Sequence, residues 1–202
     1  MNIRRTLIAV VGAAIMLGAL ASAASARNLE VSNQRLRAVF SRVEFHLPGA
    51  TSVCAATIEG SFHSRTAAKV AGSLVGYVTR VELGACTNGT ASILTSTLPW
   101  HARFSAFVGT LPEITSIIGH IIGAAARVRE AEGIACLLRS STTEPVILNF
   151  HRETVTRVIT GVEIRGTVRT GIECLGIAGS FRSDRGPVVG SPNGERVTLN
   201  LI

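Results

Sequence analysis

The sequence predicts a mainly β fold: a single-domain antiparallel sandwich or barrel with one short helix and two disulfides. Three observations lead to this prediction. Apolar and polar residues alternate along many short segments, as they do along strands that bury one face. Gly, Pro and Asn residues separate these segments at the spacing typical of sheet proteins. Four cysteines follow the N-terminal segment and can form two bridges: Cys54, Cys86, Cys136 and Cys174.

The first 26 residues have the features of a secretory signal peptide. Arg4 and Arg5 precede an apolar run over 7–20, and Ala24-Ser25-Ala26 offers the small-x-small pattern that signal peptidase recognises. We therefore expect cleavage after residue 26, by the general secretion route rather than the twin-arginine route, with an uncleaved anchor as the alternative. The longest later apolar run, 117–126, is too short to span a bilayer, so no transmembrane segment is expected after cleavage.

The remaining segment, 27–202, is expected to form one secreted, extracytoplasmic domain. Its 18 basic and 13 acidic side chains give a net charge of +5, compared with +7 for the whole chain. A positive surface favours anionic surroundings, so an anionic cell-wall polymer or a carbohydrate is the candidate partner, although this modest charge more simply indicates a solvated surface. Lys69 is the only lysine and Asp184 the only aspartate, a composition that suggests a GC-rich bacterial source.

The N-terminal half predicts strands on either side of one helix. Alternation predicts strands over 35–45, 53–62 and 77–83. Between them, Ser64 can cap a helix over 65–75, because apolar residues recur there at helical spacing. These residues are Ala67, Val70, Ala71, Leu74 and Val75.

The central segment contains one strand whose limits are set by prolines. Pro99 and Pro112 flank the alternating segment 101–108, and proline cannot donate a hydrogen bond to a sheet. Segment 114–122 has helical spacing, but its isoleucines and glycines favour a buried strand. A polar hairpin tip is expected over 127–132, before a strand over 134–138.

The C-terminal third predicts a series of short strands. They are expected over 146–150, 155–159, 162–168, 176–181 and 197–201. Asn193-Gly194 predicts a tight turn before the last of them, since both residues tolerate positive φ.

The cysteine spacing favours Cys54–Cys86 and Cys136–Cys174, because sequential pairing closes the shorter loops; the two other connectivities stay open. Each bridge would contribute about 3–4 kcal/mol in the chain-entropy model. A zinc site is disfavoured, because no two cysteines have close C-x-x-C spacing. Neither a metal nor a cofactor is expected.

The sequence contains few signs of catalysis. It has no G-x-S-x-G elbow, P-loop or dinucleotide fingerprint. Glu59 and His63 are the weak catalytic candidates, because i and i+4 share a face on a strand and a carboxylate can orient an imidazole. The competing interpretation is that His63 precedes a helix capped by Ser64.

Trp100, His101 and Arg103 are the binding candidates. An exposed Trp100 beside Arg103 would form a stacking platform for a sugar ring, a base or an acyl chain. The competing interpretation is that this single tryptophan anchors the core. Nucleic acid is disfavoured as a partner, because the C-terminal arginines have few aromatic residues among them.

These observations favour a non-enzymatic binding or structural protein of the bacterial cell envelope or medium. The alternative is an extracellular hydrolase, because many active sites have no local sequence signature. The ligand and the oligomeric state are not specified by any pattern in the chain.

Overall fold

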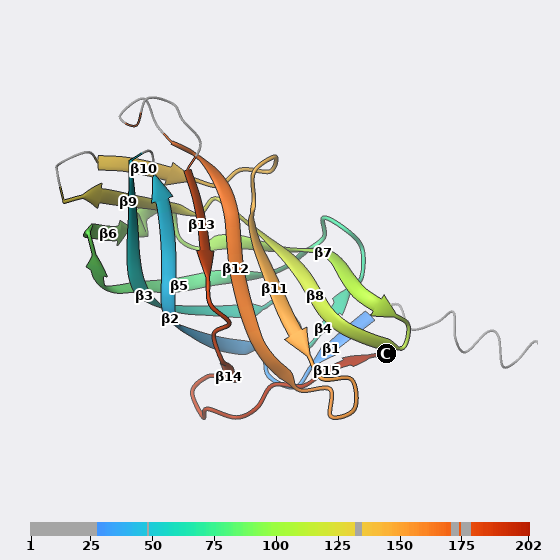
Figure 1. Ribbon diagram of the computed structural model, residues 1–202. Helices are drawn as coiled ribbons and strands as arrows, with labels where there is room; N and C mark the ends of the chain where they lie inside the picture. The colour runs from blue at the N-terminus through green and yellow to red at the C-terminus, as the bar shows by residue number, and fades with distance from the viewer. Residues whose placement is uncertain (1–27, 48, 132–134, 171–173, 175–178) are drawn as a thin grey trace, which may run out of the picture.

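Eight strands form a closed antiparallel ring. The computed structural model describes residues 28–47, 49–131, 135–170, 174 and 179–202. Each strand pairs with the next along the chain, and the last pairs with the first, which makes an up-and-down barrel (Figure 1). The strands are β2 (Arg35–Leu47), β3 (Ala50–Phe62), β5 (Leu74–Thr87), β7 (Trp100–Thr110), β8 (Glu113–Ile122), β11 (Val146–Arg152), β12 (Ile159–Thr170) and β13 (Gly179–Ser183). The expected fold class is confirmed, and of its two forms the barrel is present.

The barrel interior is the hydrophobic core, and β2 shows how the sequence keeps it apolar. Ala38, Phe40, Val43 and Phe45 are buried, although strict alternation would point Val43 outward. A β-bulge between Phe40 and Val43 absorbs one extra residue and restores the inward phase. The short strand β14 (Val188–Gly190) pairs with the N-terminal half of β2.

A small three-stranded sheet, which we call the lid, lies at one end of the barrel. It consists of β15 (Leu199–Leu201), β1 (Asn28–Val31) and β4 (Thr66–Ala68), in that order. Leu29, Val31 and Leu199 of the lid are buried in the same cluster as the barrel side chains. The lid therefore closes the core at this end.

A second extension, which we call the flap, lies at the opposite end of the molecule (Figure 1). It consists of β6 (Gly89–Ile93), β9 (Ala125–Glu130) and β10 (Ala135–Arg139), and β10 also pairs with β12. The two predicted disulfides are confirmed. Cys54–Cys86 joins β3 to β5, and Cys136–Cys174 joins the flap to the segment after β12. Two structural disulfides indicate an oxidising, extracytoplasmic environment.

The helix expected over 65–75 is absent, and this prediction was wrong. The segment contains β4, which pairs with β1, and then a turn that leads into β5. The Ser64 hydroxyl accepts a hydrogen bond from the Thr66 amide in a local turn rather than capping a helix. Gly72 has a φ of +82°, which a continuous right-handed helix does not allow. The helical element named within the described ranges is a 3-10 turn, η1 (Thr95–Thr97).

Most predicted strands are present, with shifted limits. Segment 114–122 is a strand, β8, and β7 lies between Pro99 and Pro112 as expected. The strand predicted over 155–159 is wrong: residues 154–156 form a turn, Arg157 has a φ of +61°, and β12 begins at Ile159. The polar tip predicted over 127–132 is largely strand β9, which pairs with β10 in the expected hairpin.

Some predictions concern residues outside the described ranges. The signal peptide over 1–26, the tip residues 132–134 and the start of the strand predicted over 176–181 belong to this group. Within the described ranges, no helix is long and apolar enough to cross a membrane. The Asn193-Gly194 turn is present, with Gly194 at a φ of +71°.

Candidate functional site

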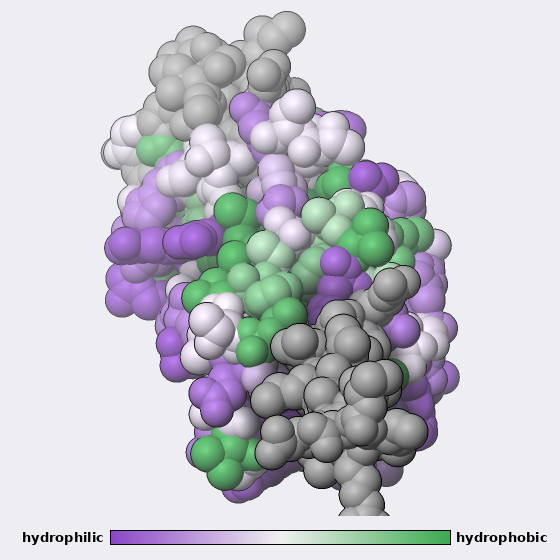
Figure 2. Space-filling model, turned by 90° about the vertical axis from the view of Figure 1, so that its right-hand side faces the viewer, coloured by the Kyte–Doolittle hydropathy of each residue, from purple (hydrophilic) through white to green (hydrophobic). Residues whose placement is uncertain are grey.

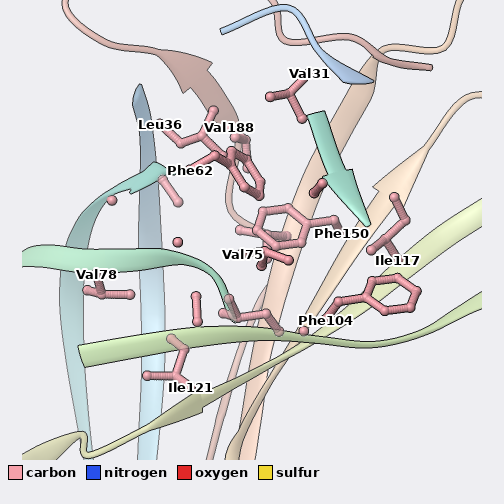
Figure 3. Close-up of a pocket in the computed structure, with 18 of the residues that line it drawn as sticks. Val31, Leu36, Phe62, Val75, Val78, Phe104, Ile117, Ile121, Phe150 and Val188 are labelled. Atoms are coloured by element: carbon pink, nitrogen blue, oxygen red, sulfur yellow. The ribbon is translucent and has the colours of Figure 1, made fainter. Parts of the chain in front are cut away.

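An apolar cavity of about 110 Å³ lies inside the barrel, toward the lid. Side chains from the barrel strands and the lid converge on it (Figure 3). Those labelled there are Val31, Leu36, Phe62, Val75, Val78, Phe104, Ile117, Ile121, Phe150 and Val188.

Small residues at inward positions leave this space unfilled. Ala38, Ala102 and Gly119 line the cavity on three different strands. The atoms nearest to a Cβ at Gly119 would be the Arg103 carbonyl oxygen at 3.4 Å and Leu148 at 3.8 Å, so a methyl group fits there. Gly76 differs, because a Cβ there would lie 2.2 Å from the Ser61 carbonyl oxygen. Gly76 is therefore required by close strand packing, whereas Gly119 is not.

A second cavity, of about 80 Å³, lies toward the flap. Its walls include Ala56, Trp100 and Leu138, and it shares Ile58 and Ile121 with the first cavity. The two hollows are thus neighbours along the barrel interior, separated by the side chains of these isoleucines.

Among the described residues, the lining of the first cavity is almost entirely apolar. Ser61, Tyr77 and Arg103 are the polar residues among its lining. Tyr77 pairs in register with Ser61 and His101, and its ring contacts the His63 and His101 rings with centroids 4.6 and 5.4 Å away. His63 and His101 are exposed, so these contacts place the Tyr77 ring on the outer wall. The cavity is suited to uncharged, apolar matter, because burying an unpaired charge is costly.

A buried arginine fastens the lid beside the cavity. Arg152 ends the inward row of β11, and its side chain is 7% exposed. Its Nε donates to the Leu199 carbonyl oxygen, and its Nη1 donates to the Ile114 carbonyl oxygen, both at 2.8 Å. Burial, with a smaller contribution from Arg157, lowers the pKa of Arg152. One side chain thus ties lid strand β15 to barrel strand β8.

The structure does not bring the catalytic candidates into contact. Glu59 lies 3.8 Å from Arg37 Nε and 3.6 Å from Arg80 Nη1, and its side chain is engaged with these arginines. His63 follows β3, is exposed, and contacts Tyr77 edge to face. Among the described residues, no hydrogen bond or ion pair joins Glu59 to His63.

The three binding candidates lie side by side on β7 but face opposite ways. Trp100 is 6% exposed, and its Nε1 donates to Thr97 Oγ1 at 2.8 Å, so it is a core side chain at the second cavity. An exposed stacking platform is therefore not formed. His101 is exposed on the outer wall. Arg103 is half-buried, and its Nε has no hydrogen-bond partner among the described residues.

Two histidine–carboxylate pairs are present that the sequence reasoning missed. His151 Nε2 lies 3.1 Å from Glu163 Oε1, and His46 Nε2 lies 3.2 Å from Glu44 Oε2. Both pairs lie on the outer wall, and none of these residues lines either cavity. Within the described part of the chain, no group of three His, Cys, Asp or Glu residues could hold a metal ion.

The fold and the site define a class: a closed eight-stranded antiparallel barrel, bridged by disulfides, with an apolar cavity in its interior. Searches with protein-family models, among curated proteins and among solved structures found no match for this chain. The cavity itself had one sequence signal. Small residues recur at inward positions of several strands, but this signal becomes visible only once the strand phases are known.

Proposed function

We propose that this chain is an exported, non-enzymatic binding protein of the bacterial cell envelope or medium, which holds a small uncharged apolar molecule inside the barrel. The observation that carries the proposal is the cavity of about 110 Å³, lined by apolar side chains and by inward Ala and Gly residues. An eight-stranded barrel is wide enough either to be filled by side chains or to hold one small ligand. The signal-peptide pattern and the disulfides support export.

The energy of an empty cavity favours a ligand over an incidental packing defect. At about 24 cal/mol per Å³, a void of this size costs about 2–3 kcal/mol. That is a large share of a typical folding free energy of about 5–15 kcal/mol. At Gly119 a single methyl group would fit without a clash, so an alanine there would make the cavity smaller, yet the sequence has glycine. A ligand that enters the cavity gains about 0.8 kcal/mol of binding free energy for each methylene group that it buries.

Thermal denaturation with 1-hexanol tests the proposal. A ligand at ten times its Kd raises stability by about 1.4 kcal/mol, which shifts the melting temperature by about 3–6 °C for a domain of this size. Hexanoate serves as the matched control ligand, because it has the same chain length and a charge that the cavity cannot pair. We expect a shift with 1-hexanol and a smaller one or none with hexanoate.

A pair of leucine substitutions localises the binding. Ala102 lines the first cavity, whereas Ala55 is exposed on the outer wall. We expect A102L to abolish the shift produced by 1-hexanol and A55L to retain it. Equal shifts in both variants would place binding elsewhere and refute the proposal.

An extracellular hydrolase is the alternative, and one observation favours it. His151 lies 3.1 Å from Glu163, and Ser116 lies directly opposite His151 in the β8–β11 register. This order of residue types matches a Ser-His-acid arrangement, although Ser116 is buried and lines neither of the two cavities described above. Hydrolysis of p-nitrophenyl acetate that is lost in both S116A and H151Q would support the alternative. Activity that is absent, or is retained in these variants, would remove it.

A further inference from the structure

Among the side chains that the structure describes, the outer face of the flap carries three exposed arginines and no acidic residue. Arg127 and Arg129 alternate along β9, and Arg139 lies on β10. In the register, Arg127 pairs with Leu137, and Arg139 is two residues further on, so all three belong to the same face. The opposite face is buried and contains Val128, Cys136 and Leu138.

These arginines are unpaired, unlike several others in the molecule. Arg42 and Arg182 contact Glu44, and Arg185 contacts Glu163. For Arg127, Arg129 and Arg139, no ion pair or side-chain hydrogen bond is found among the residues that the structure describes. Their guanidinium groups are therefore available to anions from outside.

Hydroxyl groups lie beside the arginines on the same face. Thr90 pairs with Arg129, and Ser92 pairs with Arg127, both from the neighbouring strand β6. Alternate residues along a strand are about 6.6 Å apart, so the two β9 arginines form a regular row of positive charges. Guanidinium groups bind phosphate in a bidentate geometry, and hydroxyl groups can donate to the remaining oxygens.

We propose that this outer flap face binds a linear phosphodiester polymer that carries no bases. The regular row of charges suits a polymer with one phosphate in each short repeat. Nucleic acid fits less well, because the face lacks an aromatic side chain on which a base could stack. The proposal does not rest on the cavity ligand, since the arginines lie on the flap face that points away from the interior.

A lipid surface also fits the flap less well than a polymer. Among the described residues, the exposed large hydrophobic ones are Val39, Val70, Leu74, Val108, Leu111, Val155 and Ile202, none of which belongs to the flap. Figure 2, which views the molecule from the side of the lid, shows hydrophobic residues gathered near the centre of that side, with hydrophilic ones around them. The basic flap is at the other end, and the leucine on its outer face, Leu137, is half-buried, so among the described residues this face has no exposed large apolar side chain to insert beside its charges.

Titration of the whole protein with poly(glycerol phosphate) by calorimetry, between about 50 and 400 mM salt, tests the proposal. Three phosphate contacts to a flexible chain predict that log K falls with log salt at a slope of about −2. The triple variant R127Q/R129Q/R139Q is expected to bind about ten- to a hundredfold more weakly at the lowest salt concentration. Its melting temperature should stay near that of the wild type, because exposed substitutions change stability little.

The control is R35Q/R65Q/R196Q, which removes the same charge from three other exposed arginines. We expect it to change the Kd less than about threefold, because long-range charge effects are screened at these salt concentrations. Equal weakening by both triple variants would mean that net charge, not the flap face, governs binding, and would overturn the proposal. So would no binding of the polymer, or binding only to phosphatidylglycerol vesicles or single-stranded DNA.

Discussion

Arg152 Nε donates a hydrogen bond to the Leu199 carbonyl oxygen at 2.8 Å, across the boundary between barrel and lid. The same guanidinium reaches the Ile114 carbonyl oxygen through Nη1. A buried cation that binds two backbone carbonyls fixes the position of the strand that closes the cavity. The lid is therefore held by this buried side chain in addition to apolar packing and to backbone hydrogen bonds, such as that from the Leu199 amide to the Arg157 carbonyl oxygen.

Replacing Arg152 by Met should loosen the lid. Hydrogen bonds from a charged donor contribute about 1.5–3 kcal/mol each, and removing the buried charge offsets part of that loss. We expect R152M to lower the free energy of unfolding by about 2–4 kcal/mol and to speed hydrogen exchange in β15. The control R196M, at an exposed position, should change stability by less than about 0.5 kcal/mol. Equal stability of R152M and the wild type would contradict the role assigned to Arg152.

The glycines of the cavity wall should respond in opposite ways to alanine. G119A adds a methyl group where space exists and also restricts the unfolded chain, so stability should rise by about 0.4–1 kcal/mol. G76A forces a Cβ to within 2.2 Å of the Ser61 carbonyl oxygen, so β3 and β5 must separate and stability should fall. Urea denaturation of both variants measures the difference. A destabilised G119A would show that the cavity wall is packed more tightly than described.

Glu44 should contribute a pH-dependent part of the stability. Hydrogen bonding to Arg182, and then to Arg42, lowers the pKa of Glu44, against the opposing effect of burial. Because the folded pKa lies below the ordinary value of about 4.3, this stabilisation is complete above that pH and is lost as the pH falls through the folded pKa. We expect E44Q to melt at a lower temperature than the wild type at pH 7.

The difference in melting temperature between E44Q and the wild type should shrink as the pH falls below about 4. E195Q is the control, because Glu195 is exposed and no side-chain contact is found for it among the described residues. A difference that stays constant across this range would mean that the Glu44 carboxylate does not stabilise the fold through its charge.

The Cys136–Cys174 disulfide should hold the flap to the barrel. It closes a loop with a sequence separation of 38, for which the chain-entropy model gives about 3–4 kcal/mol. The double variant C136A/C174A should lose about this much stability and should show faster hydrogen exchange in β9 and β10. Peptide mapping without reduction checks the connectivity. Fragments that link Cys54 to Cys136 or to Cys174 would contradict both bridges.

The strands were predictable where their sequence pattern and limits were local. Segment 101–108 alternates between two prolines, and β7 occupies that interval with small extensions. Between Phe40 and Val43 the alternation of inward and outward residues shifts by one. In the sequence this shift is visible as two successive polar residues, and in the structure it corresponds to a β-bulge. Barrel closure was not predictable, because it depends on pairing between β2 and β13, which are far apart in the chain.

The helix prediction failed because tertiary pairing overrode a local pattern. Residues 66–68 have no strong strand signal, but β1 offers a free edge and pairs with them. The strand prediction over 155–159 failed for a different reason: Val155 is 84% exposed, so the apolar pattern there reflects burial of Ile159 but not of Val155. The binding candidate Trp100 was placed correctly in the core by the competing interpretation, whereas the cavity beside it required the whole barrel to be known.

Xenon binding tests the central claim most directly, namely that the barrel interior can accept an apolar molecule. Apolar cavities of this kind stay dry and bind xenon or small hydrocarbons. A crystal of the protein under xenon pressure should show anomalous density between Ala102, Phe104 and Ile117, and A102L should lose it while A55L keeps it. Density found only at the surface, or none at all, would mean that the interior is a closed core and would contradict the account.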